Sequence, residues 1–248
     1  MRVLLLGGTT EARQMAHALK SAGIETVFSY AGRTNAPVAQ PVPVRVGGFG
    51  GVDGLVRYLR AEGISHIIDA THPFAAQMSW NAHHASAACG LPLVRLERPA
   101  WRAQEGDDWV HVPTLDAARE ALPQARSRVF LAIGRMHLAS FAGAPQHRYL
   151  LRLVDPPKEG LPLPDTTVIV ARGPFDVAGD TALLRDHRIT HVVAKNAGGS
   201  GALAKIEAAR ALGMRVILVD RPTLPDTTVC PDTETVLRHL NHSAERGV

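Results

Sequence analysis

Short apolar runs alternate with segments of helical periodicity through the first half of the chain. The spacing of Val52, Leu55, Val56 and Leu59 at i, i+3, i+4 and i+7 is typical of a helix that lays one face on a sheet. The apolar runs predict strands at Val3–Leu6, Thr26–Tyr30, Val42–Val46, Ile64–Ile68 and Leu93–Leu96. The other helices are predicted at Glu11–Ala22, which Gly23 ends, and at Phe74–Cys89.

The same alternation restarts in the second half. Strands are predicted at Val129–Ile133, Tyr149–Val154, Val168–Ala171, His191–Ala194 and Val216–Val219, and helices at Phe175–His187 and Ala202–Leu212. The strand-like Trp109–Val112 and the helix-like Leu115–Leu122 fit either half. Two proline-rich segments, Pro156–Pro164 and Pro222–Pro231, are expected to be loops on the surface or over a cleft.

Strands that alternate with helices indicate parallel sheets. We therefore predict an α/β fold with two Rossmann-like doubly wound parallel-sheet domains and a cleft between them. The domains are expected to be residues 1–124 and 125–248, with the boundary between Arg102 and Arg128.

Composition narrows the class of protein. No apolar run approaches the roughly 20 residues that a membrane helix needs. Aromatic residues make up 5% of the 248 residues, which is little for a binder of single-stranded nucleic acid, and the net charge of +4 is modest. Cys89 and Cys230 have no metal-type spacing, and adjacent His83 and His84 point about 100° apart on a helix. We expect a cytoplasmic protein with no metal site, no nucleic-acid partner and no membrane partner.

Ligands of doubly wound sheets bind beyond the carboxyl ends of the strands, and the first such end reads Gly7-Gly8-Thr9-Thr10-Glu11-Ala12. Gly7 suits the tight turn of a dinucleotide fingerprint, and Ala12 suits the position where helix and strand pack. The helix that follows presents free N–H groups to an anion. Thr9 or Thr10 is expected to cap this helix or to donate to a phosphate. A tight turn without a ligand is the alternative interpretation.

Two further loops belong to the first half. Arg33 and Thr34 follow the second strand, where a protein that prefers NAD commonly has an acidic residue. A guanidinium there suits a 2′-phosphate and indicates NADP(H), and a solvated loop arginine is the alternative interpretation. The buried run Ile64–Ile68 leads into Asp69-Ala70-Thr71-His72, which we place beside the dinucleotide with His72 facing the cleft. Asp69 or Thr71 serving only as a helix cap is the alternative.

Two strand ends of the second half are also unusual. One is Gly134-Arg135, and the other is a glycine-rich turn that runs from Lys195 to Ala202 and forms a possible anion cradle. A flexible Gly/Ser loop is the alternative for the turn. With Lys195, a cationic cleft lining would draw on Arg98, Arg102, Arg135, Arg152, Arg172 and Arg221.

The stretches GGTTEAR, DATHPFA, LERPAW, ARGPF and KNAGGSGALAKIEAAR occur in this order over nearly the full length. Together they resemble the precorrin-6A reductase family of cobalamin biosynthesis, which uses a reduced nicotinamide cofactor to reduce one double bond of a carboxylate-edged tetrapyrrole. The resemblance implies that the first loop holds the phosphates of NADPH, with Glu11 turned away from them. Relatives often carry a glutamate where this chain has Asp180.

The resemblance and the strand ends together assign roles to both halves. Residues 1–124 are expected to bind NADPH, and residues 125–248 to complete the substrate cleft. The cofactor-binding residues are expected to be Gly7, Gly8, Thr9, Thr10, Glu11, Arg33, Thr34, Asp69, Ala70 and Thr71. The substrate-binding residues are expected to be Arg98, Arg135, Lys195, Asn196, Gly198, Gly199 and Ser200. His72 and Lys195 are the candidate catalytic residues, although water or a substrate carboxylic acid could equally supply the proton.

Several functional alternatives stay open from the sequence. A related branch of the family acts on the cobalt-bearing substrate. A non-catalytic protein that binds a dinucleotide or a tetrapyrrole has the same loops. A nucleotide-sugar-type transferase also uses two Rossmann halves, but it leaves DATHPFA unexplained. Hand-over contacts with neighbouring enzymes of the pathway are a further expectation.

Overall fold

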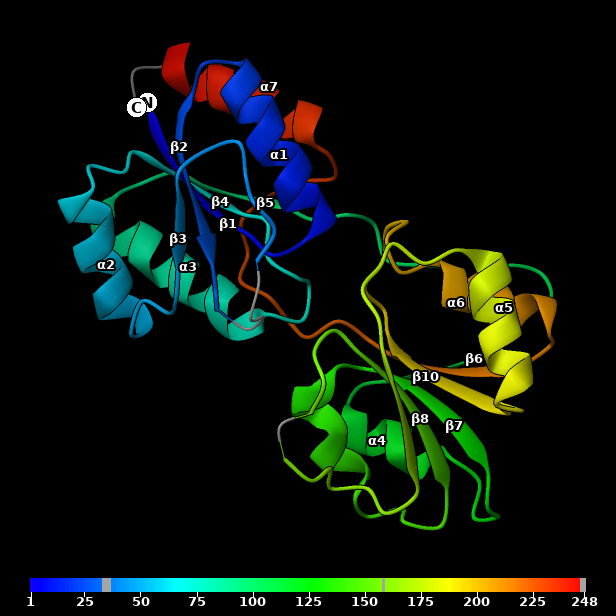
Figure 1. The fold of residues 1–248 in the computed structure, drawn as a ribbon. Helices are drawn as coiled ribbons and strands as arrows, with labels where there is room; N and C mark the ends of the chain where they lie inside the picture. The colour runs from blue at the N-terminus through cyan, green and yellow to red at the C-terminus, as the bar shows by residue number, and fades with distance from the viewer. Residues whose placement is uncertain (33–36, 158, 246–248) are drawn as a thin grey trace. The chain divides into compact units, whose positions relative to one another are not determined.

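The computed structural model describes residues 1–32, 37–157 and 159–245. The chain divides into two compact units (Figure 1). The N-terminal unit comprises Met1–Pro99 together with Pro222–Val248, and the C-terminal unit comprises Ala100–Arg221. Within the described residues, no helix is both long enough and apolar enough to cross a membrane.

The N-terminal unit contains a six-stranded parallel sheet in the order β12-β5-β4-β1-β2-β3. Its strands are β1 (Arg2–Leu6), β2 (Glu25–Tyr30), β3 (Val44–Val46), β4 (His66–Asp69), β5 (Leu93–Leu96) and β12 (Thr228–Cys230). The strand order reverses direction between β1 and β4. The loops that follow these two strands therefore meet at the switch point where such sheets bind ligands.

Helices cover both faces of this sheet, as the alternating side chains of β1 require. Val3 and Leu5 pack with α1 (Thr10–Ser21) and with Val236 and Leu240 of α7 (Thr233–Glu245). In Figure 1 the red α7 lies beside the blue α1. On the other face, Leu4 and Leu6 pack with α2 (Gly51–Ala61) and α3 (Ala76–Cys89).

The C-terminal unit contains a second six-stranded parallel sheet, in the order β6-β11-β10-β7-β8-β9. Its strands are β6 (Asp108–Val112), β7 (Arg128–Ala132), β8 (Arg148–Leu153), β9 (Thr166–Val170), β10 (His191–Lys195) and β11 (Arg215–Val219). The switch point here lies between β7 and β10. The loop of Gly134 and Arg135 and the glycine-rich turn after Lys195 are thus neighbours.

The helices of the C-terminal unit are α4 (Leu115–Glu120), α5 (Val177–Asp186), α6 (Ala204–Ala211) and the 3₁₀ helix η1 (Arg135–Phe141). Leu184 of α5 and Ile206 of α6 share a core with Phe130, Val192 and Val216 of the sheet. The predicted α/β class with two doubly wound parallel sheets is confirmed.

Each sheet takes its sixth strand from outside its own run of five. β6 directly follows β5 in the chain but pairs with β11, whereas β12 follows β11 but pairs with β5. This exchange changes the expected division: the first unit ends at Pro99 rather than near 124, and residues 222–248 return to it. The expectation that Pro222–Pro231 is only a loop was wrong for Thr228–Cys230, because these residues pair in register with Val94–Leu96.

Candidate active site

The first loop of the N-terminal unit has two glycines with different physical demands. A Cβ at Gly7 would lie 2.1 Å from Cζ of Phe28, so only glycine allows the strand to pack there. Gly8 has a φ of +126°, and a Cβ there would meet nothing within 4 Å. Gly7 is therefore explained by packing alone, whereas Gly8 leaves open space at the mouth of the loop.

Thr9 caps α1. Its Oγ1 accepts a hydrogen bond from the Ala12 N–H at 3.0 Å and donates to the Ala70 carbonyl at 2.9 Å. The hydroxyl thus joins the loops after β1 and β4, and it is occupied by the protein rather than presented to a phosphate. The exposed Thr10 accepts from Nη2 of Arg13 at 3.2 Å. The N–H groups of Thr10 and Glu11 open the helix and have no acceptor one turn earlier within it.

Glu11 forms an ion pair with Arg98, in which Nη1 lies 2.5 Å from Oε2. Both side chains are largely buried, with 18% and 13% of their surface exposed. The carboxylate of Glu11 is therefore turned toward the residues that follow β5. Arg98 was expected from the sequence to bind substrate. In the structure it lies beside the first loop of the N-terminal unit, paired with Glu11.

Asp69 ends β4 and is 2% exposed. Its Oδ1 accepts from the N–H of Thr71 at 3.1 Å and from the Thr71 hydroxyl at 2.7 Å, and its Oδ2 accepts from the Ser79 hydroxyl at 2.6 Å. The carboxylate braces the DATHPFA loop against α3. The sequence named Asp69 and Thr71 but not Ser79, since nothing local marks a helix serine as a partner.

His72 lies in the exposed part of the same loop. Its Nδ1 accepts from the Phe74 N–H at 3.2 Å. A backbone N–H can only donate, so Nδ1 must carry the lone pair and the proton of the neutral ring sits on Nε2. The loop therefore holds the imidazole so that Nε2 is its hydrogen-bond donor.

Arg33 and Thr34 lie outside the described residues. The end of β2 nevertheless has a cation that sequence reasoning missed. Nη1 of Arg45 donates to Oγ of Ser29 at 2.7 Å, and the guanidinium lies 3.8 Å from the ring centroid of Phe49. Ser29 and Arg45 are register partners on β2 and β3, and this pairing could have been found only once the two strands were aligned.

Asn196 opens the glycine-rich turn of the C-terminal unit and is 5% exposed. Its Oδ1 accepts from the N–H of Trp101 at 2.8 Å, and its Nδ2 donates to the Trp101 carbonyl at 3.1 Å. The Trp101 indole N–H donates to the Gly199 carbonyl at 2.8 Å. The side chain of Asn196 is thus directed into the protein. Its partner is Trp101, the tryptophan of LERPAW, for which the sequence alone indicated no role.

The rest of this turn is shaped by two glycines and held by the side chain of Arg221. Gly198 and Gly199 have φ angles of +68° and +67°, a region that favours glycine. Arg221 donates from Nε to the Asn196 carbonyl at 3.0 Å and from Nη2 to the Ala197 carbonyl at 3.1 Å. Lys195 is half-buried at the end of β10, and Ser200 is exposed.

The predicted cationic lining divides into two groups. Arg152 forms a nearly buried ion pair with Asp180 and lies 3.5 Å from the ring centroid of Phe175. It therefore fixes the ARGPF loop and α5. In contrast, Arg102, Arg135 and Arg172 are exposed. Among the described residues, no group of three or more His, Cys, Asp or Glu side chains converges to hold a metal ion.

The family model described as "Precorrin-6x reductase CbiJ/CobK" matches residues 2–241. The chain belongs to this family. Membership confirms that the chain is a reductase, as the five motifs predicted.

Individual relatives agree with the family model. A curated relative from Rhodobacter capsulatus, named "Precorrin-6A reductase", is 63% identical and covers 100% of this chain and 99% of its own length. A solved structure described as "CobK precorrin-6A reductase" superposes with a TM-score of 0.96 at 63% identity and covers 98% of this chain and 96% of its own. A relative from Priestia megaterium, named "Cobalt-precorrin-6A reductase", is 32% identical, and the match covers 96% of this chain and 97% of the relative.

Proposed function

We propose that this protein reduces precorrin-6A to precorrin-6B with NADPH as the electron donor. The single observation that carries the proposal is the 63% identity, over the whole chain, to a relative named for the metal-free substrate. The relative named for the cobalt-bearing substrate is only 32% identical, so precorrin-6A is favoured as the substrate.

The loop after β1 fits the pyrophosphate of a dinucleotide. Gly8 leaves open space, and the first N–H groups of the 12-residue helix α1 lie directly behind it. A helix N-terminus attracts phosphate through these donors and through its dipole. Arg98 neutralises the carboxylate of Glu11 in the same loop and so reduces its repulsion of an anion.

Preference for NADPH over NADH rests on the end of β2. The described residues that end this strand and follow it, from Ser29 to Gly32, include no carboxylate to accept from an adenosine ribose. Arg45 instead brings a guanidinium to Ser29. A guanidinium suits the 2′-phosphate that distinguishes NADPH.

The carboxyl edge of the C-terminal sheet suits a macrocycle edged with carboxylates. Arg135 follows β7, Arg172 follows β9, and Lys195 ends β10. Apolar side chains are exposed along the same edge, with Met136 at 69%, Val170 at 51% and Val154 at 43%. The cations would bind the carboxylates, and the apolar groups would contact the ring. We propose that this combination selects a carboxylate-edged macrocycle as the substrate.

NADPH, when bound, supplies a hydride to one end of the reduced double bond, and a proton must reach the other end. His72 holds a proton on Nε2 because Nδ1 is engaged by Phe74, so it is the protein donor we propose. Lys195 is proposed to bind a substrate carboxylate. Holding the macrocycle at reacting distance lowers the activation barrier by itself. In well-oriented systems this contribution is roughly 7–11 kcal/mol.

The test is turnover of precorrin-6A with NADPH and with NADH. Two signals monitor it: the loss of nicotinamide absorbance and the change of the macrocycle chromophore. We expect both changes with NADPH and a higher KM for NADH. Binding without consumption of NADPH would favour the non-catalytic alternative.

Gly8 allows a controlled test of cofactor placement. Gly8→Ala and Gly8→Leu share the strain of a side chain at φ +126°, but only leucine fills the open space. Calorimetric titration should therefore show NADPH binding weakened modestly in the alanine variant and abolished in the leucine variant. Equal affinities in the two variants would place the cofactor elsewhere.

We further propose that the enzyme works in the cytoplasm and passes its product to a neighbouring pathway enzyme.

A further inference from the structure

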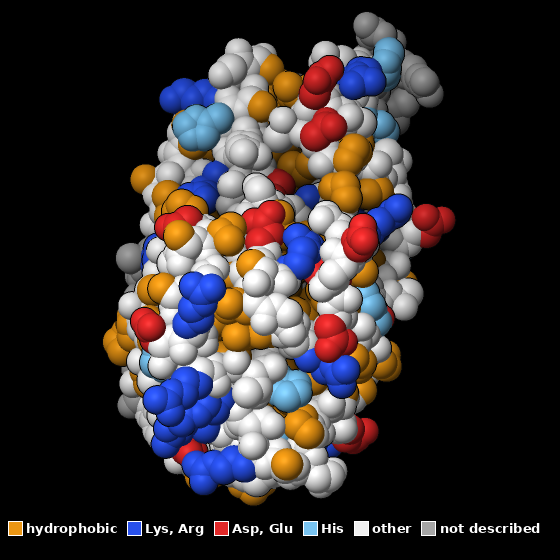
Figure 2. Space-filling model, turned by 90° about the vertical axis from the view of Figure 1, so that its right-hand side faces the viewer, with side chains coloured by type: hydrophobic (Ala, Val, Ile, Leu, Met, Phe, Trp, Pro, Cys, Tyr) orange, Lys and Arg blue, Asp and Glu red, His pale blue; other side chains and the backbone are white. Residues whose placement is uncertain are grey.

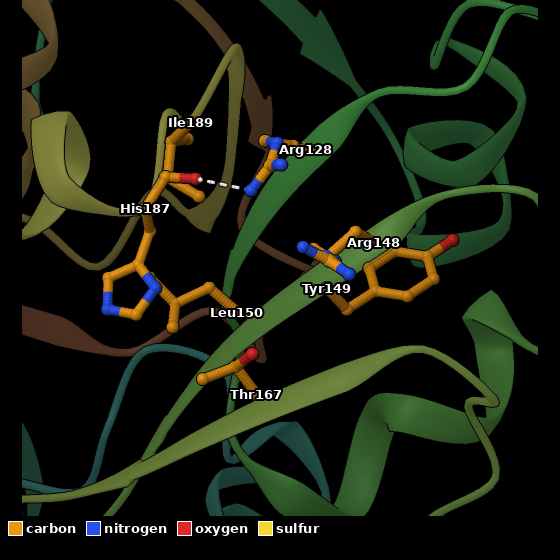
Figure 3. A pocket seen from close by; sticks show the side chains of 7 residues that line it. All are labelled: Arg128, Arg148, Tyr149, Leu150, Thr167, His187 and Ile189. Atoms are coloured by element: carbon orange, nitrogen blue, oxygen red, sulfur yellow. Dashed lines mark hydrogen bonds between the residues drawn. The ribbon is translucent and has the colours of Figure 1, made fainter.

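A cavity of about 270 Å³ lies at the amino-terminal edge of the C-terminal sheet, lined by Arg126, Ser127, Arg128 and Arg148. A second depression adjoins it and shares Arg128 and Arg148 (Figure 3). Its other walls include Leu150 of β8, Thr167 of β9 and His187, which directly follows α5. None of these residues has a role in the function proposed above.

The two shared arginines are register partners. Arg128 begins β7 and Arg148 begins β8, and the two residues are paired across these parallel strands. Neighbouring strands are only about 4.8 Å apart, so like charges in this position repel each other. An arrangement of this kind costs stability unless a negative charge lies between or beside the two side chains.

The protein supplies little negative charge at this place. Asp165 pairs with Arg126 at 2.5 Å and with Arg148 at 3.1 Å, so one carboxylate serves two guanidiniums. The guanidinium of Arg128 donates to the His187 carbonyl at 3.3 Å, which carries only the partial charge of a helix end. The three arginines thus exceed their carboxylate partner by two positive charges.

We propose that this cavity, the arginine cavity, is a binding site for a phosphate dianion, either free phosphate or the phosphate group of a small metabolite. A surplus of two positive charges matches a dianion, and guanidinium forks match the geometry of its oxygens. In the adjoining depression, which shares Arg128 and Arg148, Thr167 has a hydroxyl and Leu150 forms an apolar wall. Figure 2 shows Lys and Arg side chains gathered at the lower end of the face drawn.

The arginine cavity is separate from the candidate substrate edge of the same unit. Arg128 begins β7, whereas Arg135 follows its carboxyl end. Five strand residues span roughly 13 Å. An anion bound at Arg128 therefore does not occupy the place assigned to the macrocycle, and the site is additional to the reductase site.

The experiment measures the thermal midpoint of the full chain in inorganic phosphate and in sodium chloride of equal ionic strength. We expect phosphate near ten times its Kd to raise Tm by about 3 °C beyond the chloride control. Arg128→Gln and Arg148→Gln should lose this shift. Arg238→Gln should keep it, since Arg238 is an exposed arginine on α7 that pairs with Glu234 at 3.6 Å.

Direct calorimetric titration with phosphate provides the second measurement. Arg128→Lys retains the charge but not the fork, so we expect affinity to fall severalfold in this variant and at least tenfold in Arg128→Gln. A metabolite phosphate is distinguished from free phosphate by tighter binding of glycerol phosphate in the same titration. No phosphate binding by the wild type, or unchanged binding in both glutamine variants, would overturn the proposal. Turnover of precorrin-6A by Arg128→Gln should match the wild type, which separates this site from the proposed reaction.

Discussion

Replacing Asn196 with alanine should destabilise the C-terminal unit by about 2–4 kcal/mol. The two hydrogen bonds between its side chain and the backbone of Trp101, at 2.8 and 3.1 Å, are both buried. Their loss leaves a buried N–H and a buried carbonyl without partners, and each such group costs about 1–3 kcal/mol. The two groups together would cost about 2–6 kcal/mol, and partial relaxation of the loop brings the upper end down to about 4 kcal/mol.

The assay is urea unfolding followed by tryptophan fluorescence in a Trp80→Phe background. The chain has three tryptophans, and the remaining two, Trp101 and Trp109, both belong to the C-terminal unit, so the signal reports that unit. Glu120→Ala is the matched control in the same unit, because the carboxylate of Glu120 accepts an exposed hydrogen bond from Arg119 at 3.0 Å. It should change the free energy of unfolding by less than about 0.5 kcal/mol.

Asn196→Asp separates the two hydrogen bonds. The aspartate keeps an acceptor for the Trp101 N–H but has no donor for the Trp101 carbonyl, and it adds a charge at a site that is 5% exposed. It should therefore be at least as destabilising as the alanine variant. An Asn196→Ala protein within 0.5 kcal/mol of the wild type, at the resolution of such measurements, would refute the reasoning that this side chain holds the LERPAW segment.

Three further predictions concern packing, charge and pH. Gly7→Ala should cost about 1–3 kcal/mol by overpacking against Phe28, measured by urea unfolding monitored by circular dichroism, and a neutral result would mean that the ring moves aside easily. Asp180→Asn leaves Arg152 charged and nearly buried without its countercharge, so it should cost about 3–5 kcal/mol in the same assay, and a loss below 1 kcal/mol would contradict this account. Burial, followed by the nearby His191, lowers the pKa of His147 below 6.5, so the unfolded state takes up its proton first and stability falls as pH drops below about 6.5. His147→Asn keeps an acceptor for the Ser127 N–H and should reduce the slope of the pH profile of unfolding between about pH 7 and 5, to which the buried His66 and the half-buried His191 also contribute; an unchanged slope would exclude His147.

Local periodicity predicted most of the fold because buried parallel strands are continuous apolar runs. It did not predict β12, since Thr228–Cys230 has only three residues among prolines and becomes a strand by pairing with distant β5. The helix α7 was also missed, although Val236 and Leu240 have helical spacing. Partners far away in sequence decide such elements.

The site residues, like β12 and α7, depend on partners that are distant in the sequence. Gly8 lies in the loop after β1 and Glu11 in the first turn of α1, at the strand end and helix start that the sequence indicated. Asp69 and Asn196 were recognised as polar residues at strand ends, yet their side chains are engaged by Ser79 and Trp101. A single sequence shows that a polar group is present at an edge, but not which distant residue binds it.

The exchange of β6 and β12 affects how the chain folds during its synthesis. Residues 100–221 are contiguous, so the C-terminal unit can close its sheet while the ribosome is still adding the last residues. The N-terminal unit begins first but finishes last, since it lacks β12 and α7 until residue 245 has emerged. One edge of β5 stays paired with β4, but the edge that β12 covers is unpaired for that time and is open to wrong partners. A fragment that ends at Pro99 should therefore aggregate, whereas residues 100–221 should fold as an independent domain.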